Sequence, residues 1–191
     1  MAKVSLTING KKVEAEKGAM LLKAAKDAGF GIPTLCSNDG LEPYGACRLC
    51  MVEVENHGRK KMVAACCYPV AEGISVTTEN EEIHRIRKMI CELLLASSPV
   101  GAHAMLAKRY KITKSRFKRP DTKDTHCTLC GLCVRWCAEK VKKEAVTYTG
   151  RGVNRKVVLV PGDSDQCKSC RQCFHVCDAG RIVRVIDFGD E

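Results

Sequence analysis

Two short stretches decide the fold of this sequence: Cys127-Thr-Leu-Cys130-Gly-Leu-Cys133-Val-Arg-Trp-Cys137 and Cys167-Lys-Ser-Cys170-Arg-Gln-Cys173-Phe-His-Val-Cys177. Each holds four cysteines in the pattern C-x2-C-x2-C-x3-C. Thiolates at this spacing ligate [4Fe–4S] clusters, and where two such runs occur together the fourth cysteine of each serves the other cluster. The pattern therefore predicts two clusters whose loops are tied into one folded unit.

The exchange of fourth cysteines gives a ligand set for each predicted cluster. The first set is Cys127, Cys130, Cys133 and Cys177, and the second set is Cys137, Cys167, Cys170 and Cys173. Zinc is the main alternative, but zinc sites usually pair two separated C-x2-C knuckles with four ligands in all. Structural disulfides are a weaker alternative, because nothing in the sequence suggests export.

Composition narrows the class of protein. The chain has 191 residues, 14 of them cysteines, and its first residues contain no long apolar segment, so no signal peptide is expected. No run of about 18 apolar residues occurs, so no membrane span is expected. We expect a cytoplasmic protein, because cysteine clusters in that reducing compartment indicate metal binding or catalysis.

The formal net charge of +10 counts every thiol as neutral. Three clusters held by thiolates would lower it to roughly +4, because each oxidised cluster with four thiolates carries about −2. Aromatic residues make up only 5% of the chain, which argues against base stacking and hence against a nucleic-acid partner.

The N-terminal segment predicts a hairpin followed by a helix. Apolar and polar residues alternate over 3–15 around the turn signal Asn9-Gly10, and 19–28 has high helix propensity before Gly29. Two further strands are expected at 51–55 and 61–65. A hairpin, a helix and then a cysteine loop is the element order of a β-grasp ferredoxin.

The cysteine loop supplies Cys36, Cys47 and Cys50, with Cys66 and Cys67 following the next strand. Plant-type [2Fe–2S] ferredoxins use C-x4-C-x2-C and a distant fourth cysteine. The gap between the first two cysteines is ten residues here, so the match to that spacing is imperfect.

Leu41-Glu-Pro-Tyr-Gly-Ala-Cys-Arg-Leu-Cys-Met-Val-Glu-Val-Glu55 and Ala65-Cys-Cys-Tyr-Pro-Val-Ala-Glu-Gly73 closely resemble one family. It is the large iron–sulfur subunit of respiratory NADH dehydrogenase (complex I), with relatives in NAD(P)-linked hydrogenases, formate dehydrogenases and electron-bifurcating transhydrogenases. The resemblance covers residues 1 to about 98, and the two-cluster segment continues the same architecture. It implies a [2Fe–2S] cluster held by Cys36, Cys47, Cys50 and Cys66, with Cys66 rather than Cys67 as the fourth ligand.

The sequence departs from that family after residue 98. Larger relatives continue with a histidine and three cysteines that bind one more [4Fe–4S] cluster, whereas Ser98 stands at the histidine position here. No cysteine occurs between Cys91 and Cys127. We therefore expect this extra cluster to be absent.

A helix is predicted at 80–96, after a capping box at Thr78–Glu81. Residues 108–123 then hold eight Lys or Arg and one Asp. This segment is interpreted as a solvated connector, or as a docking or subunit-contact surface that includes Lys114, Arg116, Lys118 and Arg119; nucleic acid is the weakest alternative. Strands are predicted at 145–149, 156–160 and 182–186.

The predicted fold is therefore α+β in three parts. They are a β-grasp [2Fe–2S] domain over 1–78, a helical and basic connector over 79–122, and a bacterial-type 2[4Fe–4S] ferredoxin-like domain over 123–191.

The sequence contains no nucleophile–base motif, no P-loop and no G-x-G-x-x-G. One-electron transfer remains as its chemistry, and we expect an electron-relay subunit without catalytic residues of its own. The resemblance implies partners: a flavoprotein subunit that carries FMN or FAD and binds NAD(P)H, a further Fe–S or catalytic subunit, and ferredoxin as an outside carrier. Electron bifurcation is among the activities that the resemblance implies for such complexes. Two alternatives stay open: a free-standing multi-cluster electron carrier, and a zinc-stabilised interaction module.

Overall fold

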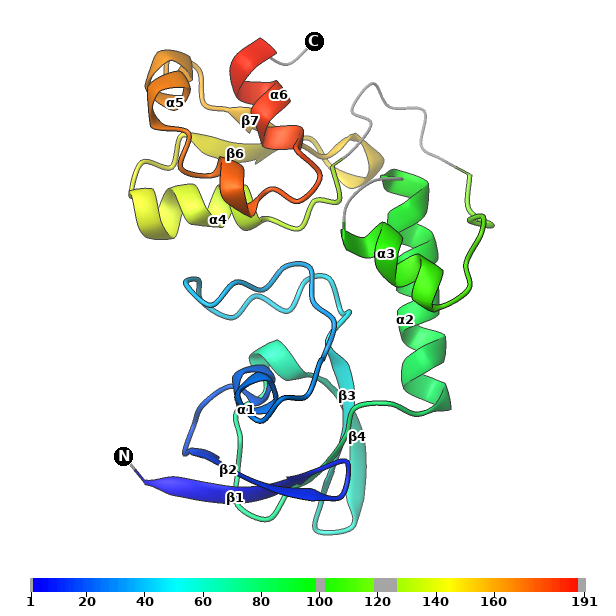
Figure 1. Ribbon diagram of the computed structural model, residues 1–191. Helices are drawn as coiled ribbons and strands as arrows, with labels where there is room; N and C mark the ends of the chain where they lie inside the picture. Colours follow the sequence, from blue (N-terminus) through cyan, green and yellow to red (C-terminus); the bar gives the residue numbers. More distant parts are fainter. Residues whose placement is uncertain (1, 99–101, 119–126, 189–191) are drawn as a thin grey trace. The chain divides into compact units, whose positions relative to one another are not determined.

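A computed structural model describes residues 2–98, 102–118 and 127–188, and Figure 1 shows their helices and strands. The chain divides into two compact units. The first comprises Met1–Ser37 and Pro43–Ile90, and the second comprises Asn38–Glu42 and Cys91–Glu191. The fold mixes helices and strands, as predicted. The predicted docking residue Arg119 lies outside the described residues.

The first unit is built on a five-stranded sheet in the order β2-β1-β5-β3-β4. Its strands are β1 (Lys3–Ile8), β2 (Lys11–Glu16), β3 (Met51–Asn56), β4 (Arg59–Ala64) and β5 (Ser75–Thr77). Only the β1–β5 pairing is parallel. Both hairpins turn on two residues with positive φ, Asn9-Gly10 and His57-Gly58, which suits the right-handed twist of the strands.

Helix α1 (Leu21–Asp27) lies against one face of this sheet (Figure 1). Its buried Leu21, Ala24 and Ala25 pack with inward-facing strand residues such as Leu6, Ile8 and Val54. The chain leaves the helix at Gly29, whose φ of 82° favours glycine. The predicted hairpin, helix and second hairpin are all confirmed, and they form the β-grasp arrangement.

Helix α2 (Glu81–Ser97) confirms the helix predicted at 80–96, but two details differ. Asn80, not Thr78, caps it: Asn80 Oδ1 accepts the N–H of Ile83 at 2.8 Å. Thr78 instead bonds the side chain of Asn9. The deeply buried stripe includes the charged residue Arg87, whereas the apolar Leu93 is 48% exposed. Helix α3 (Ala102–Arg109) follows.

The rest of the second unit pairs a small hairpin with short helices. Strands β6 (Val146–Thr149) and β7 (Lys156–Leu159) form the predicted hairpin, with a 3-10 turn η3 (Gly152–Asn154) in its loop. The helices are α4 (Leu132–Trp136), continued by a π-helical turn η2 (Cys137–Val141), then α5 (Ser164–Cys170), a 3-10 turn η4 (Phe174–Val176) and α6 (Arg181–Phe188). Within this unit, the Arg135–Glu139 pair bonds the main-chain N–H and C=O of Glu42.

The strand predicted at 182–186 is wrong, because these residues form α6. Ile182, Val185 and Ile186 are buried at helical spacing, while Arg184 between them is exposed. β-branched residues favour strands only where they pack on a pleated surface, and here burial against β7 decides the conformation. No helix of the described segments is long and apolar enough to cross a membrane.

Candidate iron–sulfur sites

The first unit brings together the four thiols that the sequence assigned to one site. Cys50 directly precedes β3, and Cys66 lies in a 3-10 turn, η1 (Ala65–Cys67), that follows β4. Cys36 and Cys47 come from the loop between α1 and β3. Cys36, Cys50 and Cys66 are buried and Cys47 is half-buried. The sheet thus fixes two of the thiols, and the loop adds the other two.

The shifted pKa values of these thiols result from how closely they lie together. A hydrogen bond with Cys36, together with burial, raises the pKa of Cys47 far above the usual thiol range. The thiol of Cys66 donates to Cys50 Sγ, which lowers the pKa of Cys50 and raises that of Cys66. Protons shared among crowded sulfurs would be displaced by a metal, because a coordinating thiol is deprotonated outright.

Main-chain N–H groups also point at these sulfurs. The N–H of Cys47 donates to Cys36 Sγ at 3.4 Å, that of Leu49 donates to Cys47 Sγ, and that of Cys66 donates to Cys50 Sγ. Hydrogen bonds to ligating sulfurs are a principal means by which proteins set the potential of a cluster. Three thiols of this quartet are therefore already placed in a polar backbone environment.

Cys67 stands apart from the quartet although it neighbours Cys66. Its Sγ lies 3.6 Å from that of Cys66, but its side chain is exposed. Partial burial and the hydrogen bond with Cys66 raise the pKa of Cys67 to about 11. Gly45 makes room for it: with φ at 68°, a Cβ on Gly45 would lie 2.9 Å from Cys67 Sγ.

The second unit brings together the other two predicted quartets, each with the fourth cysteine exchanged. One cavity is lined by Cys127, Cys130, Cys133 and Cys177 together with Val157, Val176 and Ile182. Another is lined by Cys137, Cys167, Cys170 and Cys173 together with Val141, Ala145, Val146 and Ile186. Helix α4 supplies Cys133 to the first quartet, and the π-helical turn after it begins at Cys137 of the second. Two turns of one helical segment thus serve both sites.

Burial is the main influence on these thiols. It raises the pKa of Cys133, helped by repulsion from Cys177, Cys130 and Cys127. Burial raises the pKa of Cys173 to about 12, and it also raises the pKa of Cys167; repulsion from Cys137 adds to both. Most of the repelling neighbours belong to the same quartet; the others are Cys173 for Cys133 and Asp163 for Cys167. Without positive charge at their centre, such thiols stay protonated.

Backbone donors reach this unit as well. Leu129 N–H donates to Cys127 Sγ at 3.4 Å, and Ile182 N–H donates to Cys177 Sγ at 3.5 Å. Ile182 is the second residue of α6, which covers the segment predicted as a strand, so the helix supplies both an apolar wall and a donor to the first cavity.

The donor sets have the composition that an iron–sulfur cluster requires. Among the described residues, no group of three or more His, Cys, Asp or Glu side chains is set to hold one metal ion. The four thiols of a cluster are divided between two or four iron atoms, so all four do not need to converge on one point. Each quartet offers four thiols, and cysteine thiolates are the ligands of both cluster types.

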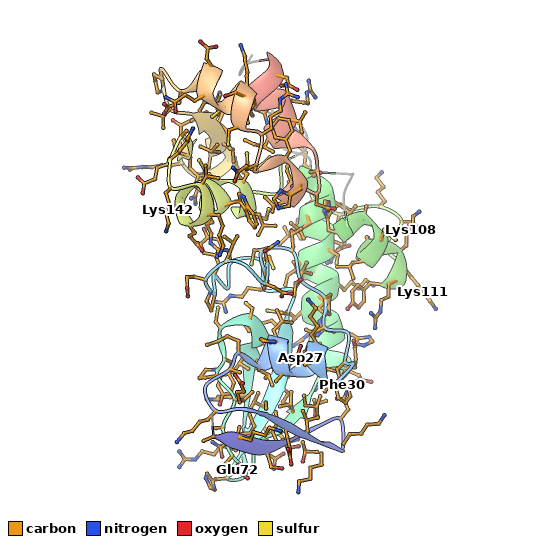
Figure 2. All side chains as sticks on the ribbon, turned by 60° about the vertical axis from the view of Figure 1, so that its left-hand side comes forward. Asp27, Phe30, Glu72, Lys108, Lys111 and Lys142 are labelled. Carbon is orange, nitrogen blue, oxygen red and sulfur yellow. The ribbon has the colours of Figure 1, made fainter. Side chains whose placement is uncertain are left out.

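The basic segment differs in part from its interpretation as a docking surface. Lys114 and Lys118 are exposed, and Figure 2 shows Lys108 and Lys111 around the end of α3. Arg116, however, forms an ion pair with the buried Glu92, with Nη2 2.7 Å from Oε2, and this pair raises the pKa of Arg116. Its charge is therefore paired with a residue of the same chain, although its side chain is 68% exposed.

One residue near the first site was missed by sequence reasoning. Arg87 is fully buried and contacts the main chain on both sides of Cys50. The only signal was its position four residues after Ile83 and four before Cys91, which places a charge on the buried stripe of an amphipathic helix.

Comparisons with known proteins agree with this geometry. Residues 1–81 match the family described as 2Fe-2S iron-sulfur cluster binding domain. The chain is 34% identical to NADPH-Fe(3+) oxidoreductase subunit alpha of Geobacter sulfurreducens, in an alignment that covers 94% of this chain and 24% of the relative. It is 35% identical to the mitochondrial NADH-ubiquinone oxidoreductase 78 kDa subunit of Neurospora crassa, over 79% of this chain and 23% of the relative. The chain thus spans about a quarter of the length of these curated relatives.

A similar solved structure is described as NAD+-reducing [NiFe]-hydrogenase in the H2-reduced state. The TM-score is 0.74 at 29% sequence identity, and the match covers 85% of this chain and 77% of that one. The resemblance stated from Leu41–Glu55 and 65–73 is thereby confirmed.

Proposed function

We propose, on the premise that residues 1–81 belong to the family of 2Fe-2S iron-sulfur cluster binding domains, that this chain is the electron-relay subunit of an NAD(P)-linked flavin oxidoreductase. Its homologues are Fe–S subunits of NAD(P)H oxidoreductase complexes, which supports an electron-transfer role. Within that role we propose three clusters: a [2Fe–2S] cluster in the first unit and two [4Fe–4S] clusters in the second.

The observation that carries this proposal is the gathering of twelve of the 14 cysteines into three groups of four. Cys36, Cys47, Cys50 and Cys66 would hold the [2Fe–2S] cluster. Cys127, Cys130, Cys133 and Cys177 would hold one [4Fe–4S] cluster, and Cys137, Cys167, Cys170 and Cys173 the other. When bound, each cluster supplies a one-electron redox centre. The surrounding Val and Ile side chains exclude water from the sulfurs, and the N–H donors stabilise their negative charge.

The number of electrons that each redox centre transfers indicates which partners are needed. Oxidation of one NAD(P)H releases a hydride with two electrons, whereas an iron–sulfur relay passes one electron at a time. A flavin on a partner subunit would accept the pair and release the electrons singly. They would pass through this chain to two molecules of a one-electron carrier such as ferredoxin, or to a further redox subunit. Bifurcation would be a property of that whole complex, and its setting would be the cytoplasm.

Anaerobic purification of the native complex tests the proposal. We expect a brown protein that copurifies with a flavoprotein and contains about ten iron and ten acid-labile sulfides in this chain, from the nuclearities that the three ligand sets bind. The isolated chain should not oxidise NAD(P)H with viologen dyes. Adding the flavoprotein should restore that reaction and extend it to an outside carrier.

Each contrary result points to a different alternative. Zinc in place of iron in native material would contradict the relay. A brown chain that remains monomeric and never copurifies with flavoprotein would indicate a free-standing carrier. Near fourteen iron per chain, the content of a third [4Fe–4S] cluster in addition, would mean that the assignment of ligands is incomplete.

A further inference from the structure

Arg87 is the largest fully buried side chain of the described residues. It lies on α2 within the first unit, and its exposed fraction is 0%. A buried arginine keeps its charge, because the guanidinium group is not deprotonated in proteins, so its surroundings must satisfy that charge. The position of its partners shows what the charge is used for.

The guanidinium group of Arg87 forms hydrogen bonds with the main chain on both sides of Cys50. Nε donates to the carbonyl oxygen of Leu49 at 3.1 Å, and Nη2 donates to the carbonyl oxygen of Met51 at 2.9 Å. The carbonyl oxygen of Cys50 itself accepts the N–H of Ala65 at 3.0 Å. Three consecutive carbonyl groups are therefore fixed, and the thiol of Cys50 is held on a rigid segment.

The counter-charge comes from Glu79, just before α2. Arg87 Nη1 lies 2.9 Å from Glu79 Oε1, and Glu79 Oε2 lies 2.5 Å from His84 Nε2. The side chain of Glu79 is 32% exposed, whereas that of Arg87 is not exposed. The positive end of this pair is thus buried beside the Cys50 segment, and the negative end reaches towards solvent.

We propose that Arg87 is a positioning residue for the [2Fe–2S] site, which holds the Cys50 segment and raises the reduction potential of the cluster. The inference rests on the proposed assignment of Cys50 as a ligand. The N–H of Cys50 shares a peptide unit with the carbonyl group of Leu49, so donation to that oxygen polarises the peptide beside the ligand.

The direction of the shift in reduction potential follows from the charge of Arg87. Reduction adds one electron to the cluster, and a buried cation nearby stabilises the more negative reduced state. Glu79 partly offsets this effect, but solvent screens it more than Arg87. Removing the positive charge should lower the potential, and removing the negative charge should raise it. A purely structural role of the pair would not produce opposite shifts.

Four variants of the full chain test this, with the potential measured by titration of the [2Fe–2S] EPR signal at a temperature where [4Fe–4S] signals are broadened. Arg87→Met should lower the midpoint potential and Glu79→Gln should raise it. Each change should alter the reduced-to-oxidised ratio at fixed potential several-fold, where tenfold corresponds to about 59 mV for one electron. Arg87→Lys keeps the charge but not the planar fork, so its potential should lie closer to that of the unaltered protein than that of Arg87→Met.

Arg85→Met is the matched control, because Arg85 is on the same helix but its side chain is 81% exposed. Its Nη2 atom lies 4.0 Å from Glu82 Oε1, which is a weak ion pair. The midpoint potential of the [2Fe–2S] cluster should not change in this variant. Equal shifts in Arg85→Met and Arg87→Met, or shifts of the same sign in Arg87→Met and Glu79→Gln, would overturn the inference.

Loss of a buried charge can prevent folding, and Glu79→Gln guards against that outcome because Arg87 remains in place. If Arg87→Met does not accumulate and Glu79→Gln leaves the potential unchanged, the inference is wrong. If the unaltered chain shows no [2Fe–2S] signal at all, the proposed function fails instead, and the two failures are distinguishable.

Discussion

The two units place their cysteines on different kinds of core. In the first unit, two of the sixteen buried core residues are cysteines, and the rest belong mainly to a sheet and a helix. In the second, four of the twelve are cysteines, and three further partly buried cysteines pack against them. The first core is thus almost wholly apolar, whereas a third of the second core consists of thiols.

This difference indicates what each unit needs in order to fold. A sheet with an apolar face and a covering helix can be stable alone. Where thiols replace apolar side chains in a core, as in the second unit, metal binding would contribute directly to folding. We therefore expect the first unit to stay folded after loss of its cluster, and the second to unfold without the two proposed clusters.

Removal of iron should reveal the difference in stability between the two units most clearly. After anaerobic treatment with a chelator, amide hydrogen exchange should remain slow in β1 and β3 but become fast in β6 and α6. The physical reason is that buried thiols, which lie in the core of the second unit, would lose the metal that the proposed clusters provide. Reconstitution with iron and sulfide should restore slow exchange in β6 and α6, which controls for irreversible damage.

Equal protection of both units in the apoprotein would contradict this prediction. So would loss of protection in both, because the core of the first unit would then also depend on its metal.

Substitution of neighbouring cysteines should give the next largest effect. Cys66→Ser should remove most of the [2Fe–2S] signal, because the buried Cys66 thiol donates to Cys50 Sγ within the quartet. Cys67→Ser should leave the signal nearly intact, because Cys67 is exposed. Visible absorption and EPR of reconstituted protein measure both.

The distance of 3.6 Å between these two sulfurs makes a double variant informative. Cys66→Ser with Cys67→Ser should lose no more signal than Cys66→Ser alone. A large additional loss would show that Cys67 replaces the missing ligand, and the reverse pattern in the single variants would mean that the fourth ligand is assigned one position too early.

Local sequence signals predicted the first unit well. Asn9-Gly10 and His57-Gly58 place both turns, and Gly29 ends α1, because each provides a backbone conformation that few residues adopt. The pairing of Cys66 with the quartet came from resemblance. Alternation of faces along an extended segment does not explain the choice between Cys66 and Cys67, because Ala65–Cys67 is a 3-10 turn.

Tertiary contacts explain what sequence reasoning missed. Ile182–Ile186 has strand propensity, yet burial of Ile182, Val185 and Ile186 produces a helix. Thr78 could have capped α2, but Asn9 occupies its hydroxyl group. The role of Arg87 depends on carbonyl groups 36 and 38 residues away, which no local pattern reveals.

Truncation of a core side chain tests whether the stability of the first unit is independent of its cluster. Leu6→Ala should lower the unfolding free energy of the first unit by about 2–5 kcal/mol, the usual range for a buried leucine. The loss should be similar with and without the cluster, because Leu6 packs within the sheet and helix core. Denaturant unfolding followed by far-UV circular dichroism measures it, and a loss confined to the cluster-loaded form would contradict it.

Exposed charges should have the smallest effect. Lys114→Glu with Lys118→Glu should slow ferredoxin-linked turnover by up to about tenfold at low ionic strength, because rim charges act mainly on association rate. Arg116 is left unaltered, since reversing it would place two carboxylates together at the buried Glu92. Lys11→Glu with Lys12→Glu, exposed positions on β2, makes the same change in charge on the first unit and should have little effect. The difference should fade as salt shortens the screening length to about 10 Å at 0.1 M. Dye-linked turnover of the flavin subunit should stay constant; its parallel fall would identify a subunit contact, and unchanged rates would show that this segment only connects other parts of the chain.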